Sequence, residues 1–150
     1  MKNTLNIQNP ANSVIADTGF WVAIGSANDP YHRLAIEVAS NLAYDPVTTW
    51  PVITESCYLL LKKQGAAAAE AFLASLQSAR IDIFHLDFAH LSVIRKLMLD
   101  YHDLPMDLAD ASLVILAEEL GHGRILSTDQ RDFRAYRWKN HQPFENLLLP

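Results

Sequence analysis

Cysteine is nearly absent from this chain of 150 residues, which contains Cys57 alone. A single thiol cannot form an internal disulfide, so the small secreted domains that depend on disulfides are excluded and a reducing, cytoplasmic setting is expected. Glycine and proline are also few, at 5 and 7 residues. Their scarcity excludes collagen-like and low-complexity chains, in which these two residue types accumulate.

Long apolar runs are missing as well. No stretch approaches the roughly 18 uncharged apolar residues that a membrane span needs, and the first 13 residues lack the apolar region of a signal peptide. We therefore expect no membrane association. The chain has no repeat and no linker, and half of it is hydrophobic, which favours one domain with one core. We expect a flexible extension over residues 1–13 and a single domain over residues 14–150.

Positive charge is in deficit, with 12 basic against 17 acidic residues and a net charge of -5. This balance at first argues against a nucleic-acid partner, because phosphates are normally contacted by a basic surface. The inference depends on where the acids lie. If four of them belong to one site, the rest of the chain carries a net charge of only -1.

Short runs rich in β-branched residues alternate with segments of helical period. The runs predict strands at 14–16, 47–49, 81–84 and 124–127, and the periodic segments predict helices at 31–42, 51–64, 66–77, 88–101 and 106–120. Strands separated by helices need crossover connections. We therefore expect an α/β fold with a central, mostly parallel sheet of four or five strands, covered by helices on both faces. Such a sheet binds its ligands beyond the carboxyl ends of the strands.

Acidic residues follow two of the predicted strands. Asp17 ends the first strand and Asp129 follows the fourth, so their side chains are expected at the same edge of the sheet. Each alone is also explained as a turn residue or a helix cap. Glu55 lies near the start of the helix predicted over 51–64, where the helix dipole alone favours an anion. These residues must therefore be judged together.

The helix predicted over 106–120 contributes two more acids. Asp107 and Asp110 are three residues apart and share one helix face. Asp107 is also well placed as an amino-terminal cap, whereas Asp110 lies a full turn into an apolar helix. A carboxylate near the core needs a partner or a cation, and the sequence between Asp107 and Arg124 contains no lysine or arginine.

Several carboxylates that converge without matching bases repel one another unless a divalent cation neutralises them. Ligands that are all oxygen atoms suit Mg²⁺ or Mn²⁺ rather than Zn²⁺. The histidines at 85, 90, 102 and 122 lack the spacing of a zinc site, and one cysteine cannot complete such a site. The expected cofactor is therefore Mg²⁺ or Mn²⁺.

Four motifs carry a resemblance to a known family. They are Val-Ile-Ala-Asp-Thr at 14–18, Thr-Glu at 54–55, Met-Asp-Leu-Ala-Asp-Ala-Ser-Leu at 106–113 and Ser-Thr-Asp-Gln-Arg-Asp-Phe at 127–133. The first alone also matches the Asp-Thr-Gly of aspartic proteases, but their fold is all-β and this chain has predicted helices. With all four motifs in this order, the sequence resembles PIN-domain ribonucleases, and most closely the VapC-type toxins of bacterial toxin–antitoxin pairs.

The resemblance implies a PIN-like fold and a metal-dependent endoribonuclease that cuts single-stranded or loop RNA. It also implies a cognate antitoxin protein and a homodimer. An acidic pocket would contain four catalytic residues, three of them metal ligands. The implied catalytic residues are Asp17, Glu55, Asp110 and Asp129; the metal ligands are Asp17, Asp110 and Asp129; and the supporting residues are Asp107, Asp132 and Thr128. A housekeeping RNA-processing nuclease and a non-catalytic PIN-like binding module are the alternatives.

Basic residues follow the last acidic motif and are interleaved with aromatic ones. We expect Arg131, Arg134, Arg137 and Lys139 to bind RNA, since such side chains contact phosphates while neighbouring aromatic rings stack on bases. The alternative is a solvated surface whose aromatic side chains pack on the core.

Overall fold

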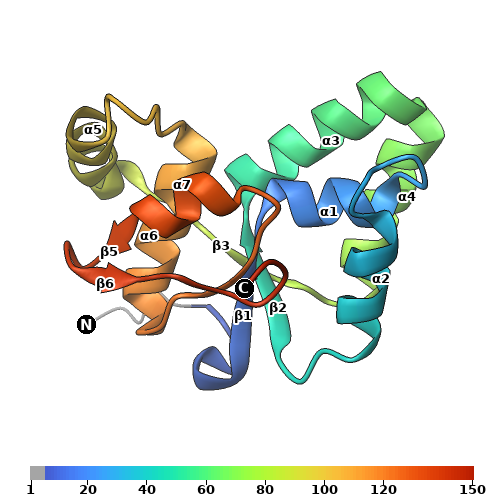
Figure 1. Cartoon of the computed structure of the whole chain (residues 1–150), viewed down its shortest axis with the longest axis horizontal. Helices are drawn as coiled ribbons and strands as arrows, with labels where there is room; N and C mark the ends of the chain where they lie inside the picture. The colour runs from blue at the N-terminus through green and yellow to red at the C-terminus, as the bar shows by residue number, and fades with distance from the viewer. Residues whose placement is uncertain (1–5) are drawn as a thin grey trace.

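A five-stranded sheet forms the centre of the protein in the computed structural model, which describes residues 6–150. All neighbouring strands in it are parallel, in the order β3-β2-β1-β4-β7 (Figure 1). At its centre, Ile15 of β1 pairs with Val47 of β2 and Ile125 of β4. The strands are β1 (Ser13–Ala16), β2 (Asp45–Thr49), β3 (Asp82–Phe84), β4 (Arg124–Leu126) and β7 (Glu145–Asn146).

Helices lie on both sides of this sheet, with α1 to α4 on one side and α5 to α7 on the other (Figure 1). This arrangement confirms the predicted α/β fold. The helices are α1 (Thr18–Gly25), α2 (His32–Ser40), α3 (Trp50–Gln64), α4 (Ala66–Ser78), α5 (Leu91–Asp100), α6 (Leu108–Leu120) and α7 (Gln130–Ala135). Two 3-10 turns (Pro10–Asn12 and Phe88–His90) and an antiparallel pair, β5 (Arg137–Trp138) with β6 (Gln142–Pro143), complete the described elements.

The core lies between the sheet and the two helical layers. Val14, Ile15 and Ala16 of β1 are fully buried, as expected for a parallel strand covered on both faces. α6 is buried around most of its circumference, including every residue of 113–117. Since α6 also contacts β1, β2 and α3, its amino terminus is rigidly placed relative to the sheet.

Every predicted strand and helix is present, with ends that differ by a few residues. The helix predicted over 88–101 is divided into a 3-10 turn and α5, because Asp87 caps the turn. The sequence patterns did not predict α1, α7, β7 or the β5–β6 pair. α1 is buried on most sides and therefore has no amphipathic period, and the others are six residues or shorter.

The expected flexible extension, residues 1–13, falls partly outside the described residues, which begin at residue 6. In the described part, the Ile7 side chain is buried, and the Arg124 guanidinium donates hydrogen bonds to the carbonyls of Ala11 and Ser13. Ser13 is the first residue of β1. This part is therefore attached to the body of the protein, while the domain boundary at residue 14 stays a prediction.

Three strands lead almost directly into helices at one edge of the sheet. β1 is followed by α1, β2 by α3 and β4 by α7, with at most three residues between strand and helix. Because these strands are parallel, the three helix amino termini lie at the same edge, where open α/β sheets bind ligands. None of the described helices has the length and apolarity needed to cross a membrane.

Candidate active site

Asp17 lies where β1 ends and α1 begins. Its Oδ1 accepts a hydrogen bond of 2.7 Å from the backbone N–H of Thr18, and its Oδ2 accepts one of 2.8 Å from the Ser127 hydroxyl. The residue is only 6% exposed, and no basic side chain in residues 6–150 forms an ion pair with it. Neutral donors alone therefore hold this buried carboxylate in place.

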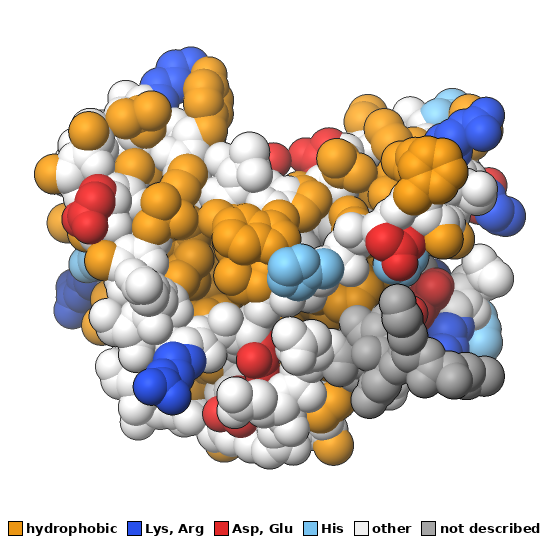
Figure 2. Space-filling view, turned by 180° about the vertical axis from the view of Figure 1, so that it is seen from behind, with side chains coloured by type: hydrophobic (Ala, Val, Ile, Leu, Met, Phe, Trp, Pro, Cys, Tyr) orange, Lys and Arg blue, Asp and Glu red, His pale blue; other side chains and the backbone are white. Residues whose placement is uncertain are grey.

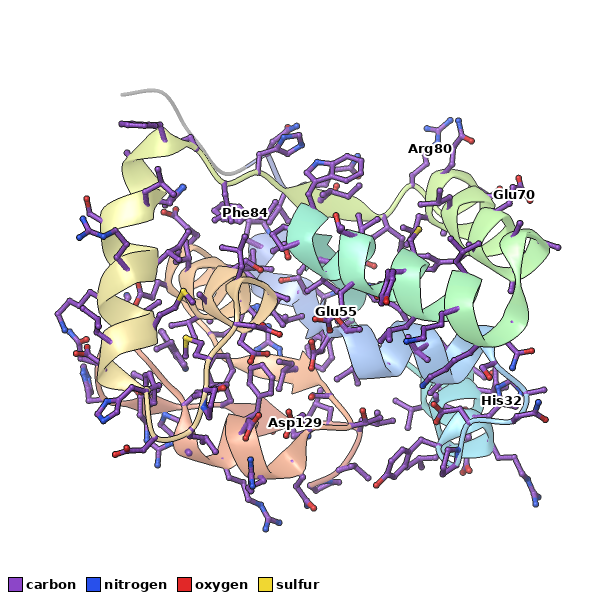
Figure 3. All side chains as sticks on the ribbon, turned by 90° about the horizontal axis from the view of Figure 1, so that it is seen from above. His32, Glu55, Glu70, Arg80, Phe84 and Asp129 are labelled. Carbon is purple, nitrogen blue, oxygen red and sulfur yellow. The ribbon has the colours of Figure 1, made fainter. Side chains whose placement is uncertain are left out.

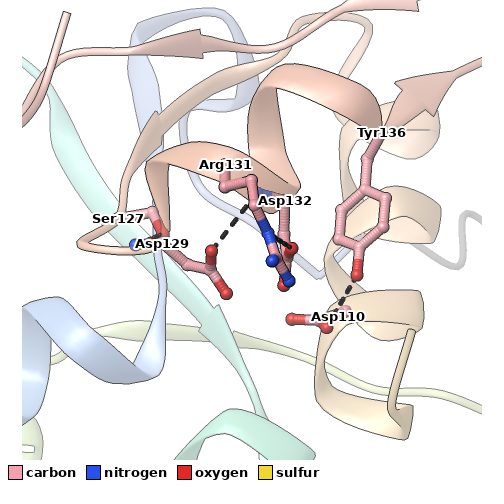
Figure 4. Close-up of polar contacts among 6 residues, drawn as sticks. All are labelled: Asp110, Ser127, Asp129, Arg131, Asp132 and Tyr136. Carbon is pink, nitrogen blue, oxygen red and sulfur yellow. Dashed lines mark hydrogen bonds and ion pairs between the residues drawn. The ribbon is translucent and has the colours of Figure 1, made fainter. Parts of the chain in front are cut away.

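Asp129 reaches the same edge from β4. Ser127 Oγ, which donates to Asp17, also accepts a hydrogen bond of 3.0 Å from the backbone N–H of Asp129. Asp129 Oδ1 in turn accepts from the backbone N–H of Asp132 and caps α7 (Figure 4). One serine hydroxyl thus fixes the β4–α7 connection relative to the end of β1.

The amino terminus of α1 packs closely against this connection. A Cβ atom built on Gly19 would lie 1.8 Å from Thr128 Oγ1, so only glycine fits here without a rearrangement. Thr128 was predicted to support the site through hydrogen bonds. Within the described residues those bonds are made by Ser127, whereas Thr128 provides the surface against which Gly19 packs.

The first turn of α6 carries two further acids. Asp107 caps the helix by accepting a hydrogen bond of 2.8 Å from the backbone N–H of Asp110. Asp110 Oδ2 accepts a hydrogen bond of 3.2 Å from the Tyr136 hydroxyl (Figure 4). The Tyr136 ring is fully buried and packs edge-on against Tyr101 and Phe133, which fixes the position of its hydroxyl.

Glu55 enters the site from α3. This helix starts at Trp50 because Thr49 caps it, its hydroxyl accepting from the backbone N–H of Val52. The buried hydroxyls of Thr49 and Ser112 lie 2.7 Å apart and join the start of α3 to α6. Figure 3 shows Glu55 on α3 near the middle of the protein and Asp129 at the start of α7.

The acids predicted from the sequence are thus brought together, and we refer to them as the acid cluster. Asp17 experiences the charges of Glu55 and Asp129, and Asp110 experiences those of Asp107 and Asp17. The cluster consists of Asp17, Glu55, Asp107, Asp110, Asp129 and Asp132. Of these, Asp132 alone has a basic partner within residues 6–150, the exposed Arg131, whose Nε lies 3.3 Å from its Oδ1.

Burial and mutual repulsion raise the pKa values of four members of the cluster. Burial raises the pKa of Asp17 to about 7, and the charges of Glu55 and Asp129 add to the effect. Burial likewise raises the pKa of Asp110 to about 8, with repulsion from Asp107 next in size. The pKa values of Glu55 and Asp129 are also raised, mainly by burial. The cluster therefore resists holding its full negative charge without a cation.

A divalent cation fits this cluster by its chemistry. All six side chains offer oxygen atoms, the donors that Mg²⁺ and Mn²⁺ prefer. The buried Thr18 hydroxyl, next to Asp17, has no hydrogen-bond partner in the described residues and is a further oxygen at this edge. No three His, Cys, Asp or Glu side chains of residues 6–150 are close enough to form a complete metal site by themselves. The cluster supplies the donors, and a cation would have to draw them together.

The basic residues predicted to bind RNA differ in their surroundings. Arg131 and Arg134 are exposed, Arg131 beside Asp132 of the cluster, and Lys139 Nζ lies 5.7 Å from the centroid of the Trp138 ring. Arg137 Nη1 instead donates to the carbonyls of residues 134, 135 and 136 at the end of α7. The aromatic rings of Phe133 and Tyr136 are buried, so they belong to the core and are not available for base stacking.

Ser127, Tyr136 and the Thr49–Ser112 pair were not predicted as parts of the site. Thr49 could have been found, because a threonine shortly before a proline at a helix start is a capping signal. Tyr136 has no local signal, since its partner Asp110 is 26 residues away. Its role depends entirely on tertiary structure.

Comparison with known proteins matches the PIN domain family to residues 14–139, a range that contains the whole acid cluster. The chain belongs to the PIN-domain family. Ribonuclease VapC26 of Mycobacterium tuberculosis is 28% identical over 124 residues, which cover 83% of this chain and 92% of that protein.

The fold of this PIN domain is also found in a solved structure. The crystal structure of Mycobacterium tuberculosis VapC20, described as a Sarcin-Ricin loop cleaving toxin, matches with a TM-score of 0.73 and 22% identity. The match covers 78% of this chain and 90% of that chain. Together these findings confirm the predicted resemblance to VapC-type PIN ribonucleases.

Proposed function

We propose that this PIN domain is a ribonuclease toxin that hydrolyses phosphodiester bonds of single-stranded or loop RNA with Mg²⁺ or Mn²⁺. One observation carries the proposal: Asp17, Glu55, Asp110 and Asp129 come from four separate elements and gather at one sheet edge without matching bases. The similarity to ribonuclease VapC26 supports the choice of RNA.

Four residues of the cluster have a defined part in this proposal. Asp17, Asp110 and Asp129 would hold the cation, and Glu55 would orient the water that attacks the phosphorus atom. The Ser127 and Tyr136 hydroxyls keep two of these carboxylates oriented. When bound, the cation supplies positive charge that offsets the charge developing on the phosphoryl group and lowers the pKa of water. Attack by water leaves a 5′-phosphate and a 3′-hydroxyl.

RNA must then be held beside an acidic site, which calls for nearby positive charge. Arg131 and Arg134 on α7 and Lys139 after it are exposed and follow Asp129 closely in sequence. We assign phosphate contacts to these three. Arg137 was expected to join them, but its bonds to backbone carbonyls favour a structural role.

The proposal includes a cognate antitoxin protein, a homodimer and a cytoplasmic location. The unpaired carboxylates of the cluster offer a binding site for a basic side chain of an antitoxin, which would neutralise them and displace the cation. The similarity to VapC20, which is described as a toxin, supports the antitoxin as a partner.

The proposal is tested with the purified protein, single-stranded RNA and Mg²⁺. We expect cleavage that EDTA abolishes and that Asp17→Asn or Asp110→Asn lowers at least 100-fold, because each variant removes a charge that would hold the cation. Asp103→Asn is the matched control, since Asp103 has a side chain that is 91% exposed and lies outside the cluster. Gel analysis with end mapping measures both the rate and the product ends.

Full Mg²⁺-dependent cleavage by both cluster variants would show that the site assignment is wrong. Metal binding without cleavage of any RNA by the unchanged protein would favour a non-catalytic PIN-like module instead.

A further inference from the structure

An open groove of about 630 Å³ adjoins the acid cluster between the first turns of α3 and α6. Glu55 and Asp107 line it and also belong to the cluster, so the groove and the site share a wall. The rest of its lining is mainly apolar, with Trp50 and Tyr58 from α3 and Leu108 from α6. The groove is therefore continuous with the cluster at Glu55 and Asp107.

The apolar side chains of this groove are unusually exposed. Trp50 is 48% exposed, Tyr58 is 58% exposed and Leu108 is 48% exposed. Hydrophobic side chains also gather on the face of the protein that Figure 2 shows. Trp50 is held by an edge-on contact with His85, their ring centroids 6.2 Å apart. Two aromatic rings are thus presented to solvent beside the candidate active site.

We propose that this groove binds an unstacked nucleobase of the RNA substrate, with Tyr58 and Trp50 as its stacking surfaces. The inference rests on the proposed ribonuclease function and adds to it a site for the nucleoside next to the cleaved bond. Base stacking on aromatic rings tolerates any base, but it requires that the base be free of a duplex. The groove therefore selects unpaired RNA.

Two observations favour a nucleobase as the occupant. First, Glu55 and Asp107 belong both to the acid cluster and to the lining of the groove, so a phosphate bound at the cluster would have its neighbouring nucleoside beside the groove. Second, no lysine or arginine lines the groove, whereas Lys62 Nζ lies 5.8 Å from the centroid of the Tyr58 ring. The groove therefore offers an apolar, aromatic surface for a base, and Lys62 supplies a positive charge near Tyr58 for a phosphate of the same strand.

The test compares protein variants with RNA substrates that each lack one base near the cleaved bond. Tyr58→Ala is expected to lower kcat/KM about tenfold on intact RNA, in line with the loss of one stacked base, and Tyr58→Phe is expected to restore most of it. Removing the base at one position should slow the unchanged protein by a similar factor and leave Tyr58→Ala unaffected. Leu61→Ala, which is exposed on the same helix but outside the groove, is the matched control.

Equal cleavage of intact and abasic RNA by Tyr58→Ala and the unchanged protein would overturn the inference and leave the ribonuclease proposal standing. If the unchanged protein cleaves no RNA, the ribonuclease proposal fails, and fluorescence anisotropy of the same oligonucleotides in EDTA still tests base binding. A dimer that Tyr58→Ala converts to a monomer, without any base dependence, would identify a second copy as the occupant and overturn the inference.

Discussion

Individual residues hold the candidate site together through neutral hydroxyl groups. Ser127 donates to Asp17 and Tyr136 donates to Asp110, so both carboxylates have a fixed orientation while keeping their charge unneutralised. A lysine or arginine in either place would form an ion pair and compete with a cation for the carboxylate. The acids themselves could be predicted from their positions after strands and at helix starts. Their hydroxyl partners could not, since one lies 110 residues away and the other 26.

The close packing of Gly19 against Thr128 predicts how one substitution changes the stability of the protein. Gly19→Ala places a carbon 1.8 Å from Thr128 Oγ1, so either Thr128 or the start of α1 must move. We expect a loss of about 1–3 kcal/mol in the free energy of unfolding, measured by urea denaturation.

The double variant Gly19→Ala/Thr128→Ala should recover part of the lost free energy of unfolding. It removes Oγ1 of residue 128, and the nearest remaining atom, the Cβ of residue 128, lies 3.0 Å from the added carbon. Thr128→Ala alone serves as the control and should stay within about 0.5 kcal/mol of the unchanged protein, because the Thr128 hydroxyl forms no hydrogen bond within residues 6–150. Gly19→Ala with unchanged stability would contradict the packing described here.

At the scale of elements, periodic and β-branched patterns predicted the longer amphipathic helices and the strands that have a clear apolar run. They failed for α1, whose Phe20, Trp21, Val22 and Ala23 are all buried, so that no polar face marks its period. They also failed for α7 and β7, which are too short for a period to be seen. These are elements that tertiary contacts stabilise, and α7 carries part of the site.

The capping of α6 allows a structural role to be separated from a chemical one. Asp107→Ser and Asp107→Ala both remove the carboxylate, but serine still accepts the hydrogen bond from the backbone N–H of Asp110. We therefore expect the alanine variant to be less stable than the serine variant by about 1 kcal/mol in thermal or urea unfolding.

RNA cleavage by these two variants tests whether the Asp107 carboxylate also has a chemical role. Equal reductions in kcat would show that the Asp107 carboxylate itself contributes to the site. If the serine variant cleaves RNA as fast as the unchanged protein, Asp107 is a helix cap and nothing more.

For the whole molecule, the acid cluster makes stability depend on pH and metal together. The folded-state pKa values of Asp17 and Asp110, about 7 and about 8, lie above the ordinary value of 3.8. Between these values the folded protein binds more protons than the unfolded chain, so its stability falls as the pH rises. The contribution of Asp17 and Asp110 to the stability of the metal-free protein is therefore greatest near the acidic end of the range between 3.8 and about 8.

Thermal unfolding in EDTA should thus show a melting temperature that falls between pH 5 and pH 8, with a smaller fall for Asp17→Asn. Mg²⁺ should raise the melting temperature more at pH 8 than at pH 5, because it binds the ionised carboxylates. At 100 times its dissociation constant the gain is about 2.7 kcal/mol. A melting temperature that responds to neither Mg²⁺ nor Mn²⁺ at pH 8 would contradict a metal site in this cluster.

The pairing of β1 with β4 has a consequence for the order in which the protein is made. Asp17 is synthesised early, but its partner Ser127 follows 110 residues later, and Tyr136 later still. A growing chain on the ribosome therefore lacks an assembled acid cluster until the residues up to Tyr136 have emerged. A product truncated before β4 would lack both Asp129 and the Ser127 hydroxyl that binds Asp17. On the proposed function, cleavage of RNA would therefore begin only after this last part of the site has been made.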